Sequence, residues 1–315
     1  MKTFLAVLLT AIFICGCGKE VEQVNHYERT EKIMGTLVTL KAQGKNSRAA
    51  VDESFDEIFA LVEDIKADVT KLNDSAGSGE FVKVSPDVFT ILKLSQHYSE
   101  LTDGAFDVTV GVAVDLWRNA RKSETLPLKE EIDSARKLVG YKHLILNEAE
   151  QSAKLDLVGV KVNLGGVGKG YGVDVARRIF IKHGITDGII DFGTSSIFAF
   201  GKKKIGLRNP RGEHEVSEVI ELDNSALSTS GDYEQFFIVE GRRYHHIINP
   251  KTCLPTDNGI ASVSVIVSSD VESCGAVADI SSTAILVLGE NNSKEFLKDS
   301  PTVSVIIKGN VKRIV

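Results

Sequence analysis

Apolar residues recur every three or four positions in several stretches of the chain, the spacing that gathers side chains on one face of an α-helix. One stretch begins at Ser85-Pro86, where a serine that can cap a helix precedes a proline suited to its first turn. The pattern predicts helices at residues 47–66, from 85–86 onward, at 129–139, at about 168–183 and at about 271–288.

Elsewhere the apolar segments are short and are separated by glycines and charged turns, a pattern typical of β-strands. Strands are predicted within 189–198 and near 204–208, 216–222, 235–239, 244–248, 260–268 and 302–307. This mixed order predicts an α/β or α+β domain rather than a barrel or a helical bundle. No linker rich in Pro, Gly or Ser divides the chain, so we expect residues 29–315 to form one functional domain.

The N-terminal end of the chain has the pattern of an export signal. Lys2 precedes an almost unbroken apolar run at residues 4–14, too short to span roughly 30 Å of hydrocarbon but suited to a signal-peptide core. The run ends in Ile14-Cys15-Gly16-Cys17, which resembles a bacterial lipobox. We therefore predict a signal peptide at residues 1–16, a lipidated Cys17 and a polar tether at residues 17–28. The alternative is an ordinary secretory signal that contains cysteines.

Lipidation of this kind predicts an exported protein anchored to a bacterial membrane, with its domain facing the periplasm or the cell exterior. The chain has 37 Lys and Arg against 43 Asp and Glu, a formal net charge of −6, and its basic residues are scattered. Since a nucleic-acid binder usually presents a basic face, this composition argues against a nucleic-acid partner.

The densest chemical signal is the glycine-rich segment 162–174, which reads Val-Asn-Leu-Gly-Gly-Val-Gly-Lys-Gly-Tyr-Gly-Val-Asp. A strand that ends in such a turn and leads into a helix can bind an anion through free backbone N–H groups, and Lys169 adds a cation. The spacing matches neither a P-loop nor a dinucleotide fingerprint. Taken alone, a glycine-rich turn of this type is more often structural.

Two further signals are weak by themselves. Asp279 and Thr283 are four residues apart on a predicted helix, so their oxygens share one face and could bind Mg²⁺. His245 and His246 are neighbours in a predicted strand, so at most one of them can point into a given site, where it could act as a base. Each signal has a structural alternative: polar residues on a helix face, or a structural histidine.

Together with other segments, these signals form a recognisable series, and the chain resembles the FAD:protein FMN transferase (ApbE) family over nearly its whole mature length. The matching segments are 34–36, 104–111 with Leu116-Trp117, 163–174, 229–233, 246–252 and 278–284. The resemblance implies a T-fold-like flavin transferase domain of the α/β (α+β) class with FAD in a cleft.

The resemblance also implies roles for individual residues. Contacts to FAD are implied for Met34, Ala105, Phe106, Asp107, Asn163, Lys169 and Ile248. Ligands of Mg²⁺ are implied to be Asp279, Thr283 and the backbone carbonyl of Gly166, with Ser282 as a weaker candidate. His246 matches the family's proposed catalytic base, whereas His245 has no match and is expected on the strand surface.

The implied activity is Mg²⁺-dependent transfer of FMN from FAD to a threonine or serine hydroxyl, with release of AMP. The implied acceptors are flavin-bearing subunits of exported or membrane redox complexes. Two alternatives remain open: an FAD pyrophosphatase in which water replaces the hydroxyl, and a non-catalytic flavin-binding lipoprotein.

Four positions depart from the family pattern. Asn163 stands where Asp is usual, 193–195 reads Gly-Thr-Ser instead of Gly-Gly-Asn, 65–73 looks short, and Cys253 replaces a glycine. Cys253 and Cys274 belong to segments that both approach the implied site, so they could form a disulfide clamp. The alternative is two buried, inert cysteines.

Replacing Cys17 tests the predicted anchor. Cys17→Ser removes the thiol that would carry the lipid, so the variant should leave the membrane fraction while the wild type stays in it. Fractionation of both proteins, followed by immunoblotting, measures the difference. Membrane association of the variant equal to that of the wild type would show that the anchor is not at Cys17.

Overall fold

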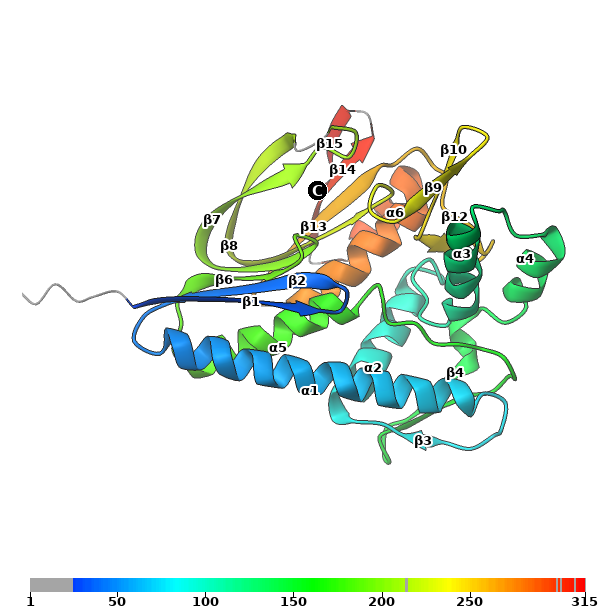
Figure 1. Cartoon of the computed structure of the whole chain (residues 1–315), viewed down its shortest axis with the longest axis horizontal. Coiled ribbons are helices and arrows are strands. Elements are labelled where there is room, and N and C mark those ends of the chain that lie inside the picture. The colour runs from blue at the N-terminus through cyan, green and yellow to red at the C-terminus, as the bar shows by residue number, and fades with distance from the viewer. Residues whose placement is uncertain (1–24, 213–214, 299, 301, 309, 315) are drawn as a thin grey trace, which may run out of the picture.

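The computed structural model describes residues 25–212, 215–298, 300, 302–308 and 310–314 (Figure 1). The predicted signal peptide and the predicted lipidation site Cys17 lie outside these residues. Within the described part of the chain, no helix combines the length and the hydropathy needed to cross a membrane.

An eight-stranded sheet forms the centre of the molecule, with the strand order β1-β2-β6-β7-β8-β13-β14-β15. Every neighbouring pair in it is antiparallel. Its strands are β1 (His26–Ile33), β2 (Thr36–Gln43), β6 (Asp187–Phe192), β7 (Ser196–Arg208), β8 (Val216–Gly231), β13 (Ser262–Ser268), β14 (Thr302–Lys308) and β15 (Asn310–Ile314). Because β1 begins at His26, the first strand includes the end of the predicted tether.

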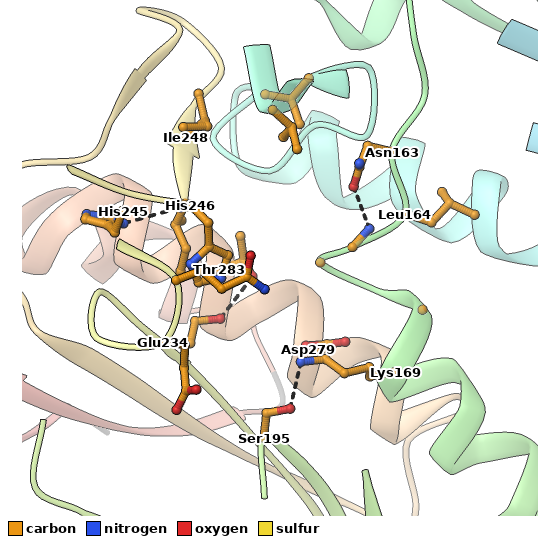
Figure 2. Close-up of a pocket in the computed structure, with 18 of the residues that line it drawn as sticks. Asn163, Leu164, Lys169, Ser195, Glu234, His245, His246, Ile248, Asp279 and Thr283 are labelled. Atoms are coloured by element: carbon orange, nitrogen blue, oxygen red, sulfur yellow. Dashed lines mark hydrogen bonds between the residues drawn. The ribbon is translucent and has the colours of Figure 1, made fainter. Parts of the chain in front are cut away.

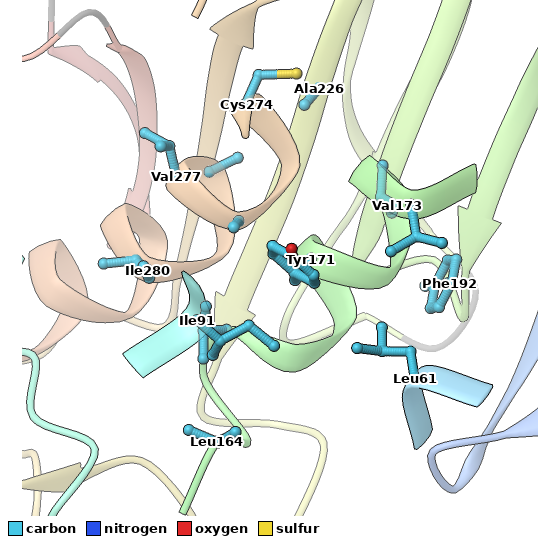
Figure 3. Close-up of a cluster of buried hydrophobic side chains, with 14 of the residues drawn as sticks. Leu61, Ile91, Leu164, Tyr171, Val173, Phe192, Ala226, Cys274, Val277 and Ile280 are labelled. Carbon is cyan, nitrogen blue, oxygen red and sulfur yellow. The ribbon is translucent and has the colours of Figure 1, made fainter. Parts of the chain in front are cut away.

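Three long helices pack on one face of this sheet (Figure 1). They are α1 (Ser47–Asp74), α5 (Gly168–Lys182) and α6 (Cys274–Lys298), and α6 is interrupted at Gly289, where φ is +79°. The main core lies between these helices, α2 (Pro86–Leu101) and the sheet, with Phe192 and Ala226 from the strands facing Val173 and Val277 from the helices (Figure 3).

A second, smaller cluster lies at one end of the molecule (Figure 1). It packs α3 (Gly111–Ser123) and α4 (Lys129–Arg136) against β9 (Phe236–Val239), β10 (Arg242–His245) and β11 (Ile248–Asn249). The short strand β12 (Leu254–Pro255) pairs with β11. Trp117 is the centre of this cluster: its ring stacks on Tyr244 at 5.5 Å and its Nε1–H donates to the carbonyl of Cys253 at 2.7 Å. The remaining small sheet contains β3 (Val82–Lys83), β4 (Leu144–Asn147) and β5 (Ser152–Leu155), with the 3-10 helix Tyr141–His143 before β4.

The predicted helices are confirmed, and the Ser85 hydroxyl accepts from the backbone N–H of Val88 as the cap prediction requires. Residues 65–73 continue α1 as helix to Asp74, which agrees with the expectation that a loop is lacking here. Two predictions need correction. The predicted strands at 204–208 and 216–222 are parts of the longer β7 and β8. The predicted strand at 244–248 is broken between β10 and β11.

The helices α5 and α6 cross closely enough to exclude side chains from the contact. A Cβ atom on Gly170 would overlap the carbonyl oxygen of Gly275 and would lie 2.7 Å from Cβ of Asp279. A Cβ on Gly275 would in turn overlap the carbonyl oxygen of Gly170. Two glycines are therefore required for the helix backbones to touch.

Asp174, one turn further along α5, fixes the first turn of α6. Its two carboxylate oxygens accept the N–H groups of Gly275 and Ala276, each at 2.8 Å, which satisfies donors that a helix N-terminus leaves free. The contact is buried, and desolvation raises the pKa of Asp174 to about 6 despite these bonds.

Gly170→Ala should destabilise the protein, because the new methyl group would force the two helices apart. Overpacking of this kind costs typically about 1–3 kcal/mol in free energy of unfolding. Urea denaturation measures the loss. Gly168→Ala is the matched control in the same helix, since its Cβ would meet no atom within 4 Å. Equal stability of the two variants would contradict the proposed crossing contact.

Candidate active site

A cleft of about 660 Å³ lies between the main core and the smaller cluster. It brings together residues that are far apart in the sequence and that come from five regions of the fold (Figure 2). Among its lining are Met34, Ala105, Phe106, Asp107, Asn163, Gly166, Lys169, His246, Ile248, Asp279 and Thr283. Every residue predicted to contact FAD, Mg²⁺ or the acceptor proton is therefore in this cleft, apart from the weaker candidate Ser282.

The glycine-rich turn packs closely against the segment before α3. A Cβ on Gly166 would lie 3.1 Å from the Phe106 ring and 3.5 Å from Oγ1 of Thr283, so the backbone occupies the space of a side chain here. The Asn163 side-chain oxygen accepts the N–H of Gly165 at 2.9 Å (Figure 2). A carboxylate could accept this bond equally well, so the turn itself does not distinguish Asn from the Asp usual in the family.

Fewer backbone N–H groups of this turn are free than the sequence suggested. The amides of Val167 and Gly168 donate to the carbonyl of Leu164, and that of Gly170 donates to Asp279. With the Gly165 amide also engaged, an anion in the cleft must be neutralised mainly by Lys169 and by any bound cation. The prediction that free amides make this turn an anion site is therefore narrowed to Gly166 and Lys169, whose backbone amides have no acceptor among the described residues.

Lys169 is held in the cleft by a residue that the sequence did not single out. Its Nζ donates to Oγ of Ser195 at 2.7 Å, and Ser195 lies in the tight turn between β6 and β7 (Figure 2). Gly193 in this turn has φ of +66°, and a Cβ there would overlap the Thr36 side chain. The turn thus places Ser195 beside Lys169 and closes one wall of the cleft.

Asp279 and Thr283 are oriented by serines of β8. Oδ1 of Asp279 accepts from Oγ of Ser228 at 3.0 Å, while Oδ2 accepts from the N–H of Gly170 at 3.0 Å. Oγ1 of Thr283 lies 3.0 Å from Oγ of Ser230. These serines occupy alternate positions of a buried strand, a polar pattern that could have indicated their role.

Ser282 does not line the cleft. Its side chain is fully buried, and its hydroxyl donates to the backbone carbonyl of Asp279 at 3.0 Å and lies 2.9 Å from Oγ of Ser230. The weaker prediction that Ser282 assists the metal directly is therefore corrected: its hydroxyl supports the helix backbone and Ser230.

The chemistry of the lining fits Mg²⁺. The carboxylate of Asp279, the hydroxyl of Thr283 and the backbone of Gly166 lie together. A small number of hard oxygen ligands suits Mg²⁺, because this ion usually keeps several water ligands and binds phosphates. Each oxygen of Asp279 accepts only one hydrogen bond and retains lone pairs. Within the described residues, no group of three or more His, Cys, Asp or Glu side chains could hold a metal elsewhere.

His246 lies in the break between β10 and β11 and lines the cleft. The residue is exposed to the solvent of the cleft, but the surrounding walls desolvate its ring and lower its pKa to about 4. The charges of Lys169 and Arg121 act in the same direction. His246 is therefore neutral near pH 7 and able to accept a proton.

His245 was expected on the strand surface, and this prediction is wrong. Its side chain is buried, and in Figure 2 it points away from Lys169 and Asp279. The two histidines thus face different ways, although only His245 belongs to a strand.

Asp107 is turned toward its own loop. Its Oδ1 accepts the N–H and the hydroxyl of Thr109, both at 2.7 Å, and desolvation raises its pKa to about 6. The carboxylate therefore shapes the Ala105–Asp107 wall of the cleft.

Cys253 and Cys274 are both free and fully buried. They belong to different hydrophobic clusters, Cys253 with Trp117 and Cys274 with the main core. The hypothesis of a disulfide clamp is not supported, and the alternative of two buried thiols describes them.

Comparisons with known proteins agree with this geometry. A family model described as the ApbE family matches residues 34–307. This chain belongs to the ApbE family. An FAD:protein FMN transferase from Vibrio cholerae is 31% identical over 92% of this chain and 89% of its own length. One from Treponema pallidum is 27% identical over 96% of this chain and 90% of its own length.

Solved ApbE structures share the fold. The crystal structure of the ApbE protein from Thermotoga maritima has a TM-score of 0.81 and 30% identity, and the match covers 92% of this chain and 97% of that one. The flavin transferase ApbE from Vibrio cholerae has a TM-score of 0.77 and 25% identity over 92% of this chain and 97% of that one. The predicted mixed α/β class is confirmed.

The low pKa of His246 can be measured in the ligand-free protein. Because desolvation and nearby cations oppose its protonation, His246 should titrate well below the ordinary histidine value of 6.5. Lys169→Met should raise this pKa, since one opposing charge is lost. NMR titration of the ring resonances measures both values, and Lys251→Met, which removes a lysine paired with Asp103, is the control. A wild-type pKa near 6.5 would contradict the desolvation argument.

Proposed function

We propose that this chain transfers FMN from FAD to a threonine or serine hydroxyl of an acceptor flavoprotein and releases AMP. The observation that supports it most strongly is the meeting of His246, Lys169, Asp279 and Thr283 in one cleft. These residues come from the β10–β11 break, α5 and α6. A proton acceptor, a cation and a hard oxygen set are the groups that attack on a diphosphate requires.

In the proposed reaction, FAD lies in the cleft with its diphosphate near Lys169. His246 accepts the proton of the acceptor hydroxyl as the oxygen attacks the phosphorus on the FMN side. The new P–O bond forms while the bond to the AMP oxygen breaks, so FMN becomes a phosphoester of the acceptor. The negative diphosphate offsets the charge of Lys169, which favours protonation of His246 during the step.

Asp279, Thr283 and the carbonyl of Gly166 would hold Mg²⁺ in this site. When bound, Mg²⁺ supplies positive charge that stabilises the diphosphate and the leaving AMP. The chain's own contribution is orientation. Ser228 and the Gly170 amide fix both oxygens of Asp279, and Ser230 fixes the hydroxyl of Thr283.

The same proposal includes the place of action. The lipobox at Cys17 and the polar tether support an exported domain held at a bacterial membrane. Acceptors would be flavin-bearing subunits of exported or membrane redox complexes, because these reach the same compartment.

Intact-protein mass spectrometry tests the transfer. With FAD, Mg²⁺ and a candidate acceptor domain, the wild type should add one FMN mass to the acceptor. His246→Ala should lower the rate by about 10²–10⁴-fold, the usual contribution of a general base. Chelation of Mg²⁺ or Asp279→Asn should abolish transfer, and the amide can still accept from Gly170 and donate to Ser228.

Asp187→Asn is the control, because it removes a carboxylate that pairs with Lys203 outside the cleft. Full transfer after chelation would exclude the metal role. FMN and AMP that accumulate without an acceptor would show hydrolysis instead of transfer.

A further inference from the structure

His246 occupies a position whose direction the sheet does not determine. β10 ends at His245 and β11 begins at Ile248, so no strand pairing restrains His246 or Ile247 between them. A proton acceptor must nevertheless lie within hydrogen-bond reach of the attacking hydroxyl. Something outside the strand pairing must therefore hold this segment.

The ring of His245 makes a hydrogen bond with each of its two nitrogens. Nε2 lies 2.7 Å from the carbonyl oxygen of Thr256, and the N–H of Ile247 donates to Nδ1 at 3.3 Å. The N–H of Thr256 also donates to the carbonyl of Ile247 at 3.0 Å. The residues directly before and after His246 are thus both tied to Thr256.

These contacts define the protonation state and the tautomer of the His245 ring. Nδ1 accepts from an amide, so it carries no proton, and Nε2 must carry the proton that it donates to a carbonyl. His245 is 6% exposed, and burial favours this neutral form of its ring. A charged His245 would lose the bond to Ile247.

We propose that His245 is a positioning residue for the transfer: its neutral ring holds the backbone on both sides of His246 and so fixes how His246 faces the cleft. This rests on the proposed function, in which His246 accepts the acceptor's proton. His245 is among the residues that line the cleft, but both of its ring nitrogens are engaged by Thr256 and Ile247. It acts only through its neighbour.

The ring of His246 also has a hydrogen bond with the backbone of Gln235, but that contact does not hold the backbone of Ile247. The N–H of Ile247 has no other acceptor among the described residues, and Ile247 is 7% exposed, so water does not satisfy it readily. Losing the ring of His245 leaves a buried donor unpaired, which destabilises the present conformation of the segment. The segment between β10 and β11 can pair the Ile247 N–H again by rotating its backbone, and such a rotation moves His246.

Three substitutions separate the two ring contacts. His245→Leu removes both; His245→Asn places an oxygen near Nδ1 for Ile247, and His245→Gln places an amide N–H near Nε2 for Thr256. We expect kcat for FMN transfer to fall about 100-fold in the leucine variant, the scale that a 1 Å misplacement can cost. The asparagine and glutamine variants should each recover part of this loss. The KM for FAD should change little in all three.

The matched control is His183→Leu, which removes a histidine bonded to Glu53 at 2.6 Å, away from the cleft. It should leave kcat unchanged. A wild-type kcat in His245→Leu would overturn the proposal. So would equal losses in all three variants with FAD binding falling in parallel, because that pattern indicates general damage.

A second measurement does not depend on transfer. Hydrogen exchange of the Ile247 amide should be slow in the wild type and in His245→Asn, and fast in His245→Leu and His245→Gln. If the wild type transferred no FMN but showed this exchange pattern, the proposed function would fail, while the role of His245 in holding the backbone would stand. Exchange that is the same in all four proteins would overturn that role itself.

Discussion

The contact of α5 with α6 is the constraint on which the rest of the site depends. The two helices touch through Gly170 and Gly275, so their separation is set by backbone atoms and has almost no freedom to vary. The same contact aims the N–H of Gly170 at Asp279, while Asp174 caps the first turn of α6. One crossing therefore fixes the distance from the glycine turn and Lys169 to the proposed metal ligands.

The opposite wall of the cleft has a different origin. It belongs to the small cluster around Trp117, which joins α3 to the β9–β12 segments through stacking on Tyr244 and a bond to Cys253. His246 comes from this half, whereas Lys169 and Asp279 come from the main core. The proposed proton acceptor and the proposed metal ligands are thus supported by separate cores, and the cleft lies between them. Rigid packing within each half supplies the precision that a phosphoryl transfer needs.

Much of this arrangement could be predicted from sequence, and the failures have physical reasons. The glycine turn, Asp279, Thr283 and His246 lie in motifs whose order indicated a single site, and the cleft unites them. The role of Ser195 was missed because it lies in a turn and its partner Lys169 is distant in sequence. The alternating serines of β8 indicate a polar strand face, but not which residues they bond. His245 was misplaced since alternation says only that it points away from its neighbour, and the far side of this strand is buried. The break at His246 depends on tertiary bonds to Thr256 that no local signal shows.

The departures from the family pattern show how the backbone constrains the sequence. Thr194 and Cys253 both stand where the family pattern has glycine, and both keep a positive φ, +62° and +55°. An L-residue pays about 1–2 kcal/mol for this conformation, so the turn geometry persists at a cost in stability. Local bonds offset part of it: the N–H of Thr194 donates to Asp191 at 2.6 Å, and the N–H of Cys253 donates to Asn249 at 2.8 Å while its thiol fills the space beside Trp117. Because these turns present Ser195 and the segment after His246 to the cleft, the shape of the site depends on the conformation that Thr194 and Cys253 keep.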